Sequence, residues 1–537
     1  MFGNRRSHWV AIGLLLSASM ASLWLRPLLP VDETRYLSVA WEMWQKGDFI
    51  LPTLNGDPYT HKPPLLFWLI HAEWAVLGVN AYAPRLISLG CALVSLPLVS
   101  NLATNLWPER PIIRNYAPLI LASFLCWLVY STTLMFDVLL GVFALAAIAA
   151  GVRASLSGRI AWFAVCGIML GAGLLTKGPA ILLSTLPVLL LMPWWRRSEN
   201  RLPLDRWYAG LALAVVTGAA IMLAWVYPAI LRGGPTFSHE LIWKQTAGRI
   251  AESFAHAHPW YWYLVLLPLL LFPWGVLVWE KAWRGRLWRD PGERFCVAWF
   301  GVSLIAFSLI SGKQVHYLIP TLPAIALWLA ARYADRPITR VSEVSLGGIS
   351  ILAGLALLFT PEWCELSGVE EVCTSSPRVG ALLPLAIGFV LLRARPDAGP
   401  RMAWIAITSG ALFLGLLMNF VTIFRLQDVQ PLAQRIKALQ DQGVIVVNVD
   451  KYHDQYQFAG RLEKPLLEIR EPTLDSWAAE HPEACLIFYA RSTDSPLAQI
   501  ATEIYPYRGK QALMVTAEDW LAYKRRRKQP IQMTHQD

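Results

Sequence analysis

Long apolar segments recur along most of this 537-residue chain. A helix needs about 20 apolar residues to cross the hydrocarbon core of a bilayer. Segments near that length lie at 8–29, 82–106, 115–133, 134–152, 160–176, 178–195, 207–231, 260–280, 294–311, 315–333, 343–361, 379–393 and 402–424. Because lipid offers the backbone no hydrogen-bond partner, such segments are helical. The pattern predicts an α-helical polytopic membrane protein with about thirteen transmembrane helices.

The distribution of charge supports a membrane protein. Hydrophobic residues make up 55% of the chain and charged residues only 16%, whereas soluble domains carry about 25% charged residues. The formal net charge is +10, but most Arg and Lys residues lie in short loops between apolar segments. That placement follows the positive-inside rule and does not form a nucleic-acid-binding face. We therefore expect no nucleic-acid partner.

The basic loops also predict the topology. Loops on one side carry Arg5, Arg6, Arg110, Arg114, Arg153, Arg159, Arg196, Arg197, Arg206, Lys281, Arg284, Arg286, Arg289, Arg332, Arg336, Arg393 and Arg395. This side is the cytoplasm by the positive-inside rule, and thirteen spans then place the tail outside. The apolar run 64–78 is only about fifteen residues long, and counting it as a span would reverse every later loop. We interpret it as an interfacial or re-entrant helix within a first outer loop at 30–81.

The segment "ETRYLSVAWEMWQKG" precedes that run and predicts an amphipathic helix on the membrane surface. The tail has a different composition from the rest of the chain. "GVIVVNV", "PLLEI" and "ACLIFYA" are typical of short buried strands, and "PLAQRIKALQDQG" and "TLDSWAAEHP" are typical of helices. The sequence therefore predicts two domains. A membrane domain spans 1–424, with outer loops at 30–81 and 232–259, and a small extracytoplasmic α/β domain spans 425–537.

Seven cysteines do not indicate a disulfide framework. Five are isolated in apolar runs or in the tail. Cys364 and Cys373 differ because they bracket the short polar loop "CELSGVEEVC". If this loop faces an oxidising compartment, a bridge is plausible, and the sequence leaves both outcomes open. The apolar N-terminus lacks a clear cleavage site for a signal peptidase and is interpreted as an uncleaved first span.

Ionisable and tyrosine side chains gather at the predicted outer ends of the spans. They are Asp32, Glu33, Arg35, Tyr59, His61 and Lys62 in the first outer loop, Asp137 between the third and fourth spans, Lys177 after the fifth, Arg249, His256 and His258 in loop 232–259, and Lys313 and Tyr317 between the ninth and tenth. Ionisable groups at membrane depth are costly and are functional candidates by default. The sequence therefore predicts one polar cavity that faces outward.

The chemistry of this set favours group transfer from a lipid phosphate. Cations at a hydrophobic boundary suit a phosphate whose tail stays in the bilayer, because charge-assisted contacts are strong at low dielectric. A nearby carboxylate suits a general base or a group that orients the nucleophile. Each residue alone is a weak signal, and the combination is more specific.

The first loop reads "DETRY", then "GDFILPTLNGDPYTHKPPLLFW". With its acidic pair, "NG.PY" and "KPPL" in that order, the chain resembles the protein O-mannosyltransferase-like superfamily of membrane glycosyltransferases with the C fold. Within it, the chain is most similar to bacterial aminoarabinose transferases that modify lipid A. The likeness runs from the first span to "GKQVHYLIPTLPAIALW" at 312–328. It implies a polyprenyl-phosphate sugar donor, no nucleotide sugar, and a periplasmic active site at the inner membrane.

The resemblance also implies roles for single residues. Asp32 matches the essential acid of the first loop, and Asp137 matches the second acid at the outer turn. His256 matches a histidine before the family's aromatic run, with His258 as the alternative. The donor phosphate falls at four residues, which are Arg35, Tyr59, Lys62 and Tyr317.

One position departs from the family pattern. Members nearest the aminoarabinose enzymes often carry Glu before the motif lysine, and His61 stands there in this chain. A carboxylate is the natural partner of a sugar ammonium, so the departure weakens the case for aminoarabinose. A divalent metal held by His61, with His256 or His258, is chemically possible, and the sequence leaves this open.

Structural readings compete with each functional one. Asp32 and Glu33 could cap the helix that follows them, and Lys62 could be an interfacial lysine that reaches toward water. Lys177 and Lys313 are open between the two readings, and Arg249 leans toward function because the outer face has few arginines. Asp137, in "TTLMFDVLL", has apolar neighbours that do not fit a solvated turn. His239 and His316 are interpreted as ordinary boundary residues.

These observations predict a glycosyltransferase that moves a sugar, such as an amino sugar, from undecaprenyl phosphate to lipid A or a related envelope glycolipid. Protein hydroxyls or a polysaccharide are the rival acceptors. A transporter of lipid-linked sugars is the rival class of protein. Transporters place their sites near the middle of the membrane, whereas here the polar groups lie at the outer ends of the spans.

Overall fold

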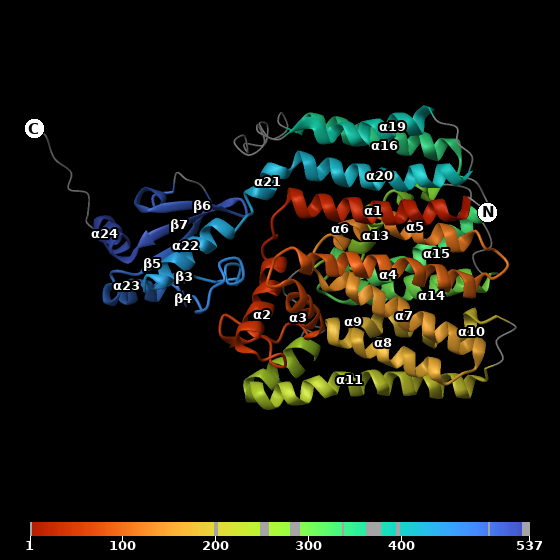
Figure 1. The fold of residues 1–537 in the computed structure, drawn as a ribbon, viewed down its shortest axis with the longest axis horizontal. Coiled ribbons are helices and arrows are strands. Elements are labelled where there is room, and N and C mark those ends of the chain that lie inside the picture. The colour runs from red at the N-terminus through yellow and green to blue at the C-terminus, as the bar shows by residue number, and fades with distance from the viewer. Residues whose placement is uncertain are drawn as a thin grey trace, which may run out of the picture. The chain divides into compact units, whose positions relative to one another are not determined.

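The computed structural model describes residues 3–197, 202–247, 257–279, 290–335, 338–360, 377–393, 398–491 and 495–528. The chain divides into two compact units. The membrane unit consists of Met1–Leu25 and Thr60–Val421, and the sheet unit consists of Arg26–Tyr59 and Thr422–Asp537. Figure 1 shows the long helices of the first unit and the small sheet of the second.

Among its described residues, the membrane unit consists of helices joined by loops, with one isolated β-bridge between Ala257 and Gly312. Its helices before residue 200 are α1 (Gly3–Leu25), α3 (Leu65–Leu77), α4 (Ala83–Leu106), α5 (Ile113–Ser123), α6 (Leu125–Ser131), α7 (Phe136–Ser157), α8 (Ala161–Lys177), α9 (Ala180–Leu190) and α10 (Met192–Trp195). Those after residue 200 are α11 (Leu204–His239), the π-helical η1 (Glu240–Ala247), α13 (Trp262–Leu270), the 3₁₀ segment η2 (Trp274–Trp279), α14 (Pro291–Leu309), the 3₁₀ segment η4 (Val315–Thr321), α15 (Leu322–Asp335), α16 (Arg340–Leu358), the 3₁₀ segment η5 (Arg378–Ala381), α19 (Leu382–Arg393) and α20 (Ala398–Asn419). The short helix α21 (Val421–Arg425) joins the two units.

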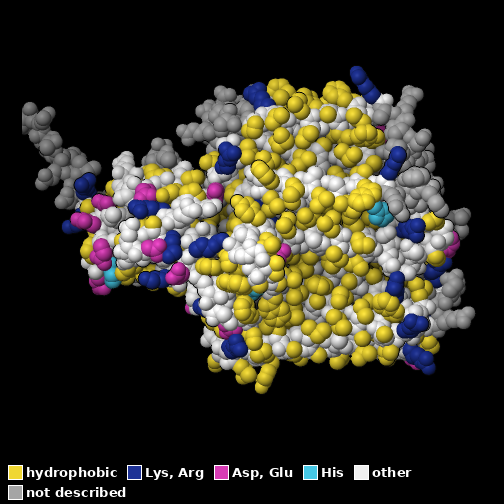
Figure 2. All heavy atoms as spheres, in the orientation of Figure 1, with side chains coloured by type: hydrophobic (Ala, Val, Ile, Leu, Met, Phe, Trp, Pro, Cys, Tyr) yellow, Lys and Arg dark blue, Asp and Glu magenta, His cyan; other side chains and the backbone are white. Residues whose placement is uncertain are grey.

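The prediction of a polytopic helical membrane protein is confirmed. Within the described residues, eight helices are long and apolar enough to cross a membrane, or nine if the pair α5 and α6, bent by 67°, is one span. Each of the predicted apolar segments contains at least one helix, but several are short or broken, so the count of thirteen stays a prediction. The run 64–78 forms α3, whose 13 residues are too few to span a bilayer alone. Figure 2 shows apolar side chains covering the visible face of the membrane unit.

Helices α7 and α8 form a hairpin in the membrane unit. The apolar window of α7 is 83% buried, the largest share among the candidate spans of the described chain. A short turn at 158–160 joins the two helices, and α8 packs against α7. The N-terminus of α7 and the C-terminus of α8 therefore lie at the same end of the unit. This arrangement places Asp137, in the first turn of α7, near Lys177, in the last turn of α8.

Helices α8 and α11 pack with their backbones in close approach. A Cβ atom added at Gly167 would lie 2.7 Å from the carbonyl oxygen of Ala214 and 2.7 Å from the Cβ of Thr217. Gly171 follows one turn later on the same face of α8, and on α11 a Cβ at Gly218 would lie 3.2 Å from the backbone of both glycines. Small residues four apart are the usual device for close helix packing in membranes.

The sheet unit contains the small α/β domain that the tail predicts. Its elements after residue 425 are α22 (Gln430–Asp441), β3 (Val446–Val449), β4 (Leu467–Ile469), α23 (Glu471–Glu480), β5 (Cys485–Ala490), η6 (Ala498–Ile500), β6 (Glu503–Tyr507), β7 (Lys510–Thr516) and α24 (Ala517–Lys528). The strand order is β4-β3-β5-β7-β6. Strand β3 is parallel to β4 and β5, and β7 is antiparallel to β5 and β6.

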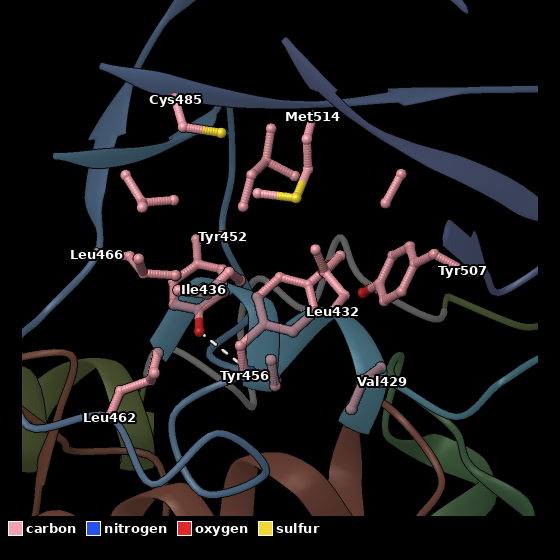
Figure 3. Packing of buried hydrophobic residues seen from close by; sticks show 14 residues of the cluster. Val429, Leu432, Ile436, Tyr452, Tyr456, Leu462, Leu466, Cys485, Tyr507 and Met514 are labelled. Carbon is pink, nitrogen blue, oxygen red and sulfur yellow. Dashed lines mark hydrogen bonds between the residues drawn. The ribbon is translucent and has the colours of Figure 1, made fainter. Parts of the chain in front are cut away.

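Two apolar clusters cover the two faces of this sheet. Helix α22 packs on one face, where Leu432 and Ile436 meet the tyrosine rings of Tyr452, Tyr456 and Tyr507 (Figure 3). Helices α23 and α24 pack on the other face through side chains that include Leu474, Ala478 and Trp520. The predicted strands and helices of the tail are confirmed, and β6, β7 and α24 are additional elements.

Residues 26–59 belong to the sheet unit, although the sequence pattern predicts 26–29 as the end of the first span and 30–59 as part of the first outer loop of the membrane domain. They form α2 (Asp32–Lys46) and the two-stranded hairpin of β1 (Thr53–Leu54) and β2 (Asp57–Pro58). The hairpin turn is Asn55-Gly56, with φ of 52° and 89°, the backbone that this dipeptide favours. The predicted helix is therefore confirmed. Its apolar face is buried inside the sheet unit instead of lying on a membrane surface.

A buried ion pair fixes the chain where it enters α2. Arg26 donates to both carboxylate oxygens of Glu33, at 2.6 Å and 3.2 Å, and the backbone N–H of Leu29 donates to the same group at 2.8 Å. The side chains of Arg26 and Glu33 are each 3% exposed. Glu33, one of the sequence-predicted candidates, thus closes the turn from residue 26 into the helix.

Five cysteines, Cys91, Cys126, Cys166, Cys296 and Cys485, are free thiols, as expected from their isolated positions. Cys364 and Cys373 lie outside the described residues, so their bridge stays a prediction.

We predict that Gly167→Ala destabilises the membrane unit. The added methyl group would overlap backbone atoms of α11, and overpacking of this kind costs about 1–3 kcal/mol. The measurement is thermal unfolding of the purified protein in detergent, with Gly90→Ala as the control. Gly90 is also inside a helix, but no atom lies within 4 Å of its added Cβ, so the control should match or slightly exceed wild type. Equal melting temperatures of the two variants would contradict the close packing of α8 and α11.

We also predict that Glu33→Gln lowers the stability of the sheet unit. The change leaves the buried guanidinium of Arg26 without its counter-charge, and breaking a buried pair on one side costs about 3–5 kcal/mol. The matched control is Glu518→Gln, which changes a carboxylate that is exposed at the start of α24. Both are compared with wild type by thermal unfolding, and no difference between them would show that the pair is not stabilising.

Candidate functional site

The sequence-predicted site residues fall into two groups, one in each unit. The membrane-unit group is formed by Lys62, Asp137, Lys177 and Tyr317. The first-loop group is formed by Asp32, Arg35 and Tyr59 in the sheet unit. The prediction that both groups line one cavity stays a prediction.

A buried ion pair is the centre of the membrane-unit group. The Nζ atom of Lys177 lies 2.6 Å from Oδ1 of Asp137, and the Asp137 side chain is 2% exposed. The α7–α8 hairpin brings these residues together although 40 positions separate them. The helix ends also favour both charges, because an anion suits the N-terminus of α7 and a cation suits the C-terminus of α8. A solvated-turn role for Asp137 is inconsistent with this burial.

His316 belongs to the same group, although its sequence position suggests an ordinary boundary residue. Its Nε2 atom lies 4.0 Å from the second carboxylate oxygen of Asp137. Its Nδ1 atom lies 3.5 Å from the hydroxyl of Tyr130. The only signal in the sequence is that His316 directly precedes Tyr317, whose ring contacts it at 5.1 Å. Sequence reasoning missed it because the 3₁₀ segment η4 that presents it against α7 has no clear periodicity.

Aromatic rings hold the cations of this group. The Nζ atom of Lys177 lies 4.8 Å from the ring centre of Tyr317, and that of Lys62 lies 5.9 Å from the ring centre of Phe136. Since Phe136 precedes Asp137, these contacts place Lys62 beside the start of α7. Such cation–π contacts fix an ammonium group without neutralising its charge. The rings therefore help to hold Lys62 and Lys177 in position at the start of α7 and the end of α8.

Lys313 is placed differently from the other cations. It is 2% exposed, and its ammonium donates to the carbonyls of His258 at 2.8 Å and Ile310 at 2.6 Å. These bonds tie the chain before α13 to the chain before η4. His258 stacks on Trp262 with ring centres 4.3 Å apart. Both residues thus have structural contacts that account for their positions.

Asp32 is the exposed carboxylate of the first-loop group. Arg35 Nη2 donates to its Oδ1 atom at 2.6 Å, and the hydroxyl of Tyr36 donates to the same oxygen at 3.3 Å. The Asp32 side chain is 48% exposed, and no side-chain capping bond forms at the start of α2. Capping alone therefore does not explain Asp32. Its carboxylate is oriented by two neighbours and remains accessible.

The electrostatic surroundings of Arg35 favour its charged form. Burial lowers the pKa of its guanidinium, but Tyr59, Tyr36 and Asp32 raise it, and the net direction is upward. Tyr59 itself is buried, and its backbone N–H bonds to Pro52 at 2.8 Å. Nearby, burial raises the pKa of Asp454 to about 7, with Glu468 and Glu42 adding to the shift. The guanidinium of Arg35 therefore interacts with the carboxyl groups of both Asp32 and Asp454.

The remaining sequence-predicted candidates include the histidines of the predicted metal site. His61 is exposed in the loop before α3, whereas His256 and Arg249 lie outside the described residues. Among the residues that the structure describes, no three His, Cys, Asp or Glu side chains come together to hold a metal ion. The metal site predicted from His61 with His256 or His258 therefore stays a prediction.

Chemically, each group pairs a carboxylate with fixed positive charge. The buried Asp137–Lys177 pair gives the membrane unit an oriented anion and cation at the ends of two helices. The half-exposed Asp32 can accept a proton or orient a hydroxyl. Cations beside apolar helices can bind a phosphate whose hydrocarbon tail stays in lipid.

Comparison with known proteins finds similar membrane glycosyltransferases. Residues 61–225 match the family model described as dolichyl-phosphate-mannose-protein mannosyltransferase. An undecaprenyl phosphate-alpha-4-amino-4-deoxy-L-arabinose arabinosyl transferase of Pseudomonas paraeruginosa is 31% identical over 408 residues, which cover 72% of this chain and 70% of the relative. A relative of the same name from Pseudomonas fluorescens is 27% identical and covers 94% of this chain and 93% of its own length.

The fold is similar to that of a solved member of this group. The crystal structure of ArnT from Cupriavidus metallidurans bound to undecaprenyl phosphate matches with a TM-score of 0.73 and 21% identity, covering 95% of this chain and 98% of that one. The apo state of the same protein matches with a TM-score of 0.75. Together with the relatives' identity over most of the sequence, these matches place this chain in the family of undecaprenyl phosphate-alpha-4-amino-4-deoxy-L-arabinose arabinosyl transferases, which are membrane glycosyltransferases.

Proposed function

We propose that this chain transfers 4-amino-4-deoxy-arabinose from undecaprenyl phosphate to lipid A, on the periplasmic face of a bacterial inner membrane. The observation that carries the proposal is the buried Asp137–Lys177 pair beside Lys62 and Tyr317 at the end of the α7–α8 hairpin. Family membership supports the lipid-linked donor. The basic loops on the opposite side of the predicted spans support the periplasmic orientation.

The proposed reaction is one displacement at the anomeric carbon of the sugar. An acceptor oxygen forms a bond to this carbon, the bond to the phosphate oxygen breaks, and undecaprenyl phosphate leaves with an additional negative charge. Lys62, with Arg35, Tyr59 and Tyr317, binds the phosphate and stabilises that charge. Charge-assisted hydrogen bonds from the cations would then replace the water that hydrates the phosphate.

The carboxylates have roles that depend on the acceptor. If the acceptor is a hydroxyl, Asp32 removes its proton as a general base. If it is a phosphate of lipid A, the nucleophile is already anionic, and Asp32 and Asp137 orient groups or stabilise positive charge that develops on the sugar. In both cases Lys177 holds the Asp137 carboxylate in a fixed orientation. We assign no step to a metal ion.

We predict that lipid A from cells with this chain gains the mass of one aminoarabinose, and that Asp32→Asn abolishes the gain. The measurement is mass spectrometry of extracted lipid A, with protein levels checked in the membrane fraction. The control variant Asp441→Asn changes an exposed carboxylate of the C-terminal domain and should retain the modification. Lipid A of unchanged mass would move the acceptor to protein or polysaccharide. A gain that survives Asp32→Asn would remove Asp32 from the reaction.

We also predict different kinetic defects for the two groups. Lys62→Ala removes a charged contact to the donor phosphate, worth about 2 kcal/mol, and should raise the donor KM roughly 30-fold. Asp32→Asn should instead lower kcat by about 100-fold or more with a smaller effect on KM. The control Lys510→Ala removes an exposed lysine and should change neither. If both variants lowered kcat and raised KM by the same factors, this division of roles would be contradicted.

A further inference from the structure

Within residues 26–59 of the sheet unit, side-chain hydrogen bonds join helix α2 to the β1–β2 hairpin. The carboxylate of Glu42 on α2 accepts from the backbone N–H of Gly56 in the hairpin turn at 3.2 Å. Lys46, one turn later, donates to the same carboxylate at 3.4 Å and to the hydroxyl of Thr53 at 2.9 Å. The helix and the hairpin are therefore joined by their own side chains, so a force on one is transmitted to the other.

Helix α2 forms hydrogen bonds with residues 454–466 of the C-terminal domain, which we call the clamp segment. The hydroxyl of Ser38 lies 2.7 Å from the carbonyl oxygen of Asp454 and accepts from the N–H of Phe458 at 3.2 Å. Ser38 is fully buried. One turn further on, the indole N–H of Trp41 donates to the carbonyl of Leu462 at 3.0 Å. Because these partners are backbone groups, the contacts fix the position of α2 relative to the clamp segment.

The clamp segment holds the hairpin even more specifically, through one amide. The Nδ2 atom of Asn55 donates to the carbonyl of Leu466 at 2.9 Å, and its Oδ1 atom accepts from the N–H of Leu466 at 2.8 Å. Oδ1 also accepts from the side chain of Gln457 at 2.7 Å. The side chain thus pairs with Leu466 as a neighbouring strand would. A Cβ at Gly56 would lie 3.2 Å from Pro465, so the approach is tight.

These contacts act on the residues proposed to react. Ser38 follows Asp32 by six residues on one helix, a separation of about 9 Å along a rigid axis. Asn55 precedes Tyr59 by four residues, across the hairpin whose second strand ends at Pro58. A shift at Ser38 or Asn55 therefore becomes a shift of Asp32, Arg35 or Tyr59. A misplacement of about 1 Å can cost roughly 100-fold in rate.

We propose that the clamp segment is a positioning device for the active site, in which Ser38 and Asn55 are the positioning residues that set Asp32 and Arg35. This inference rests on the proposed function. It makes the C-terminal domain part of the catalytic apparatus and gives a role to a domain that contains none of the predicted reacting residues. Ser38 and Asn55 do not touch the substrate and act only through the helix and hairpin they hold.

The test uses Asn55→Asp in the full-length chain. The ionised carboxylate still accepts from Leu466 and Gln457, but it cannot donate to the carbonyl of Leu466 and repels it. We expect kcat per folded molecule to fall roughly 10- to 100-fold at pH 8. When the introduced carboxyl is protonated, its O–H replaces the lost donor. The ratio of variant to wild-type kcat should therefore rise as the pH falls through the pKa of that carboxyl.

Division by the wild-type rate removes the titration of native groups around the clamp. These groups are Glu42, Lys46, Asp57, Asp454, Arg461 and Glu468. The matched control is Gln442→Glu, the same amide-to-acid change on an exposed residue of the C-terminal domain. Its kcat ratio should stay near one at every pH.

A second readout needs no enzymatic activity. Hydrogen exchange should become faster in the α2 amides of the Asn55→Asp protein at pH 8, whereas the amides of β3, β5 and β7 keep their protection. If the variant fails to fold, Trp41→Phe replaces it, because this change removes the bond to Leu462 and keeps an aromatic ring beside Arg461. The expected loss of kcat is then about 3- to 10-fold, equivalent to one net hydrogen bond.

Unchanged kcat in the folded variant, or loss of kcat without faster exchange in α2, would overturn the positioning role. A loss that does not recover at low pH would also overturn it, because the lost donor would then not be the cause. Failure of the proposed function looks different. In that case Asp32→Asn retains its transferase activity or the wild-type chain has none, while the exchange result still reports whether the clamp holds α2.

Discussion

The absence of water in a bilayer is the constraint on which this structure depends. Backbone N–H and C=O groups in lipid must bond to each other, so the apolar segments become helices and charged groups move to their ends. Asp137 and Lys177 illustrate the result, because each lies in the terminal turn of a helix. The helix ends stabilise both charges, and the two charges stabilise each other. The candidate site of this unit accordingly lies where helices begin and end.

Much of the fold follows from local sequence patterns. The length of the apolar segments predicts the membrane helices. Short-range periodicity predicts the strands and helices between residues 431 and 490 of the tail. The pairing of Asp137 with Lys177 also follows, once α7 and α8 are recognised as a hairpin of helices that are similar in length. The exact number of spans does not follow, because several predicted segments are broken into short helices, such as α5 and α6 with their 67° bend.

Other features depend on contacts that no local pattern records. Ser38 and Asp454 are 416 positions apart, and nothing in "YLSVAWEM" indicates that its buried face meets a segment of the tail instead of a membrane. The amphipathic pattern of α2 correctly predicts a buried face but not its partner. His316 was missed for a related reason, since a 3₁₀ segment presents its side chains with a period that differs from that of both helix and strand. Within each unit, contacts between distant segments complete the groups that local motifs begin.

The path of the chain has a consequence for the order in which the protein is made. The chain leaves the membrane unit after Leu25, returns at Thr60 and leaves again after Val421, so α2 belongs to a unit whose other part is synthesised much later than α2. At about 5–20 residues per second, the ribosome needs roughly 20–80 s between the first loop and the clamp segment. During this interval α2 and its hairpin lack the hydrogen bonds that the clamp segment supplies. The first loop therefore reaches its final environment only after the clamp segment has been made, and the sheet unit cannot be completed before the membrane unit has been synthesised.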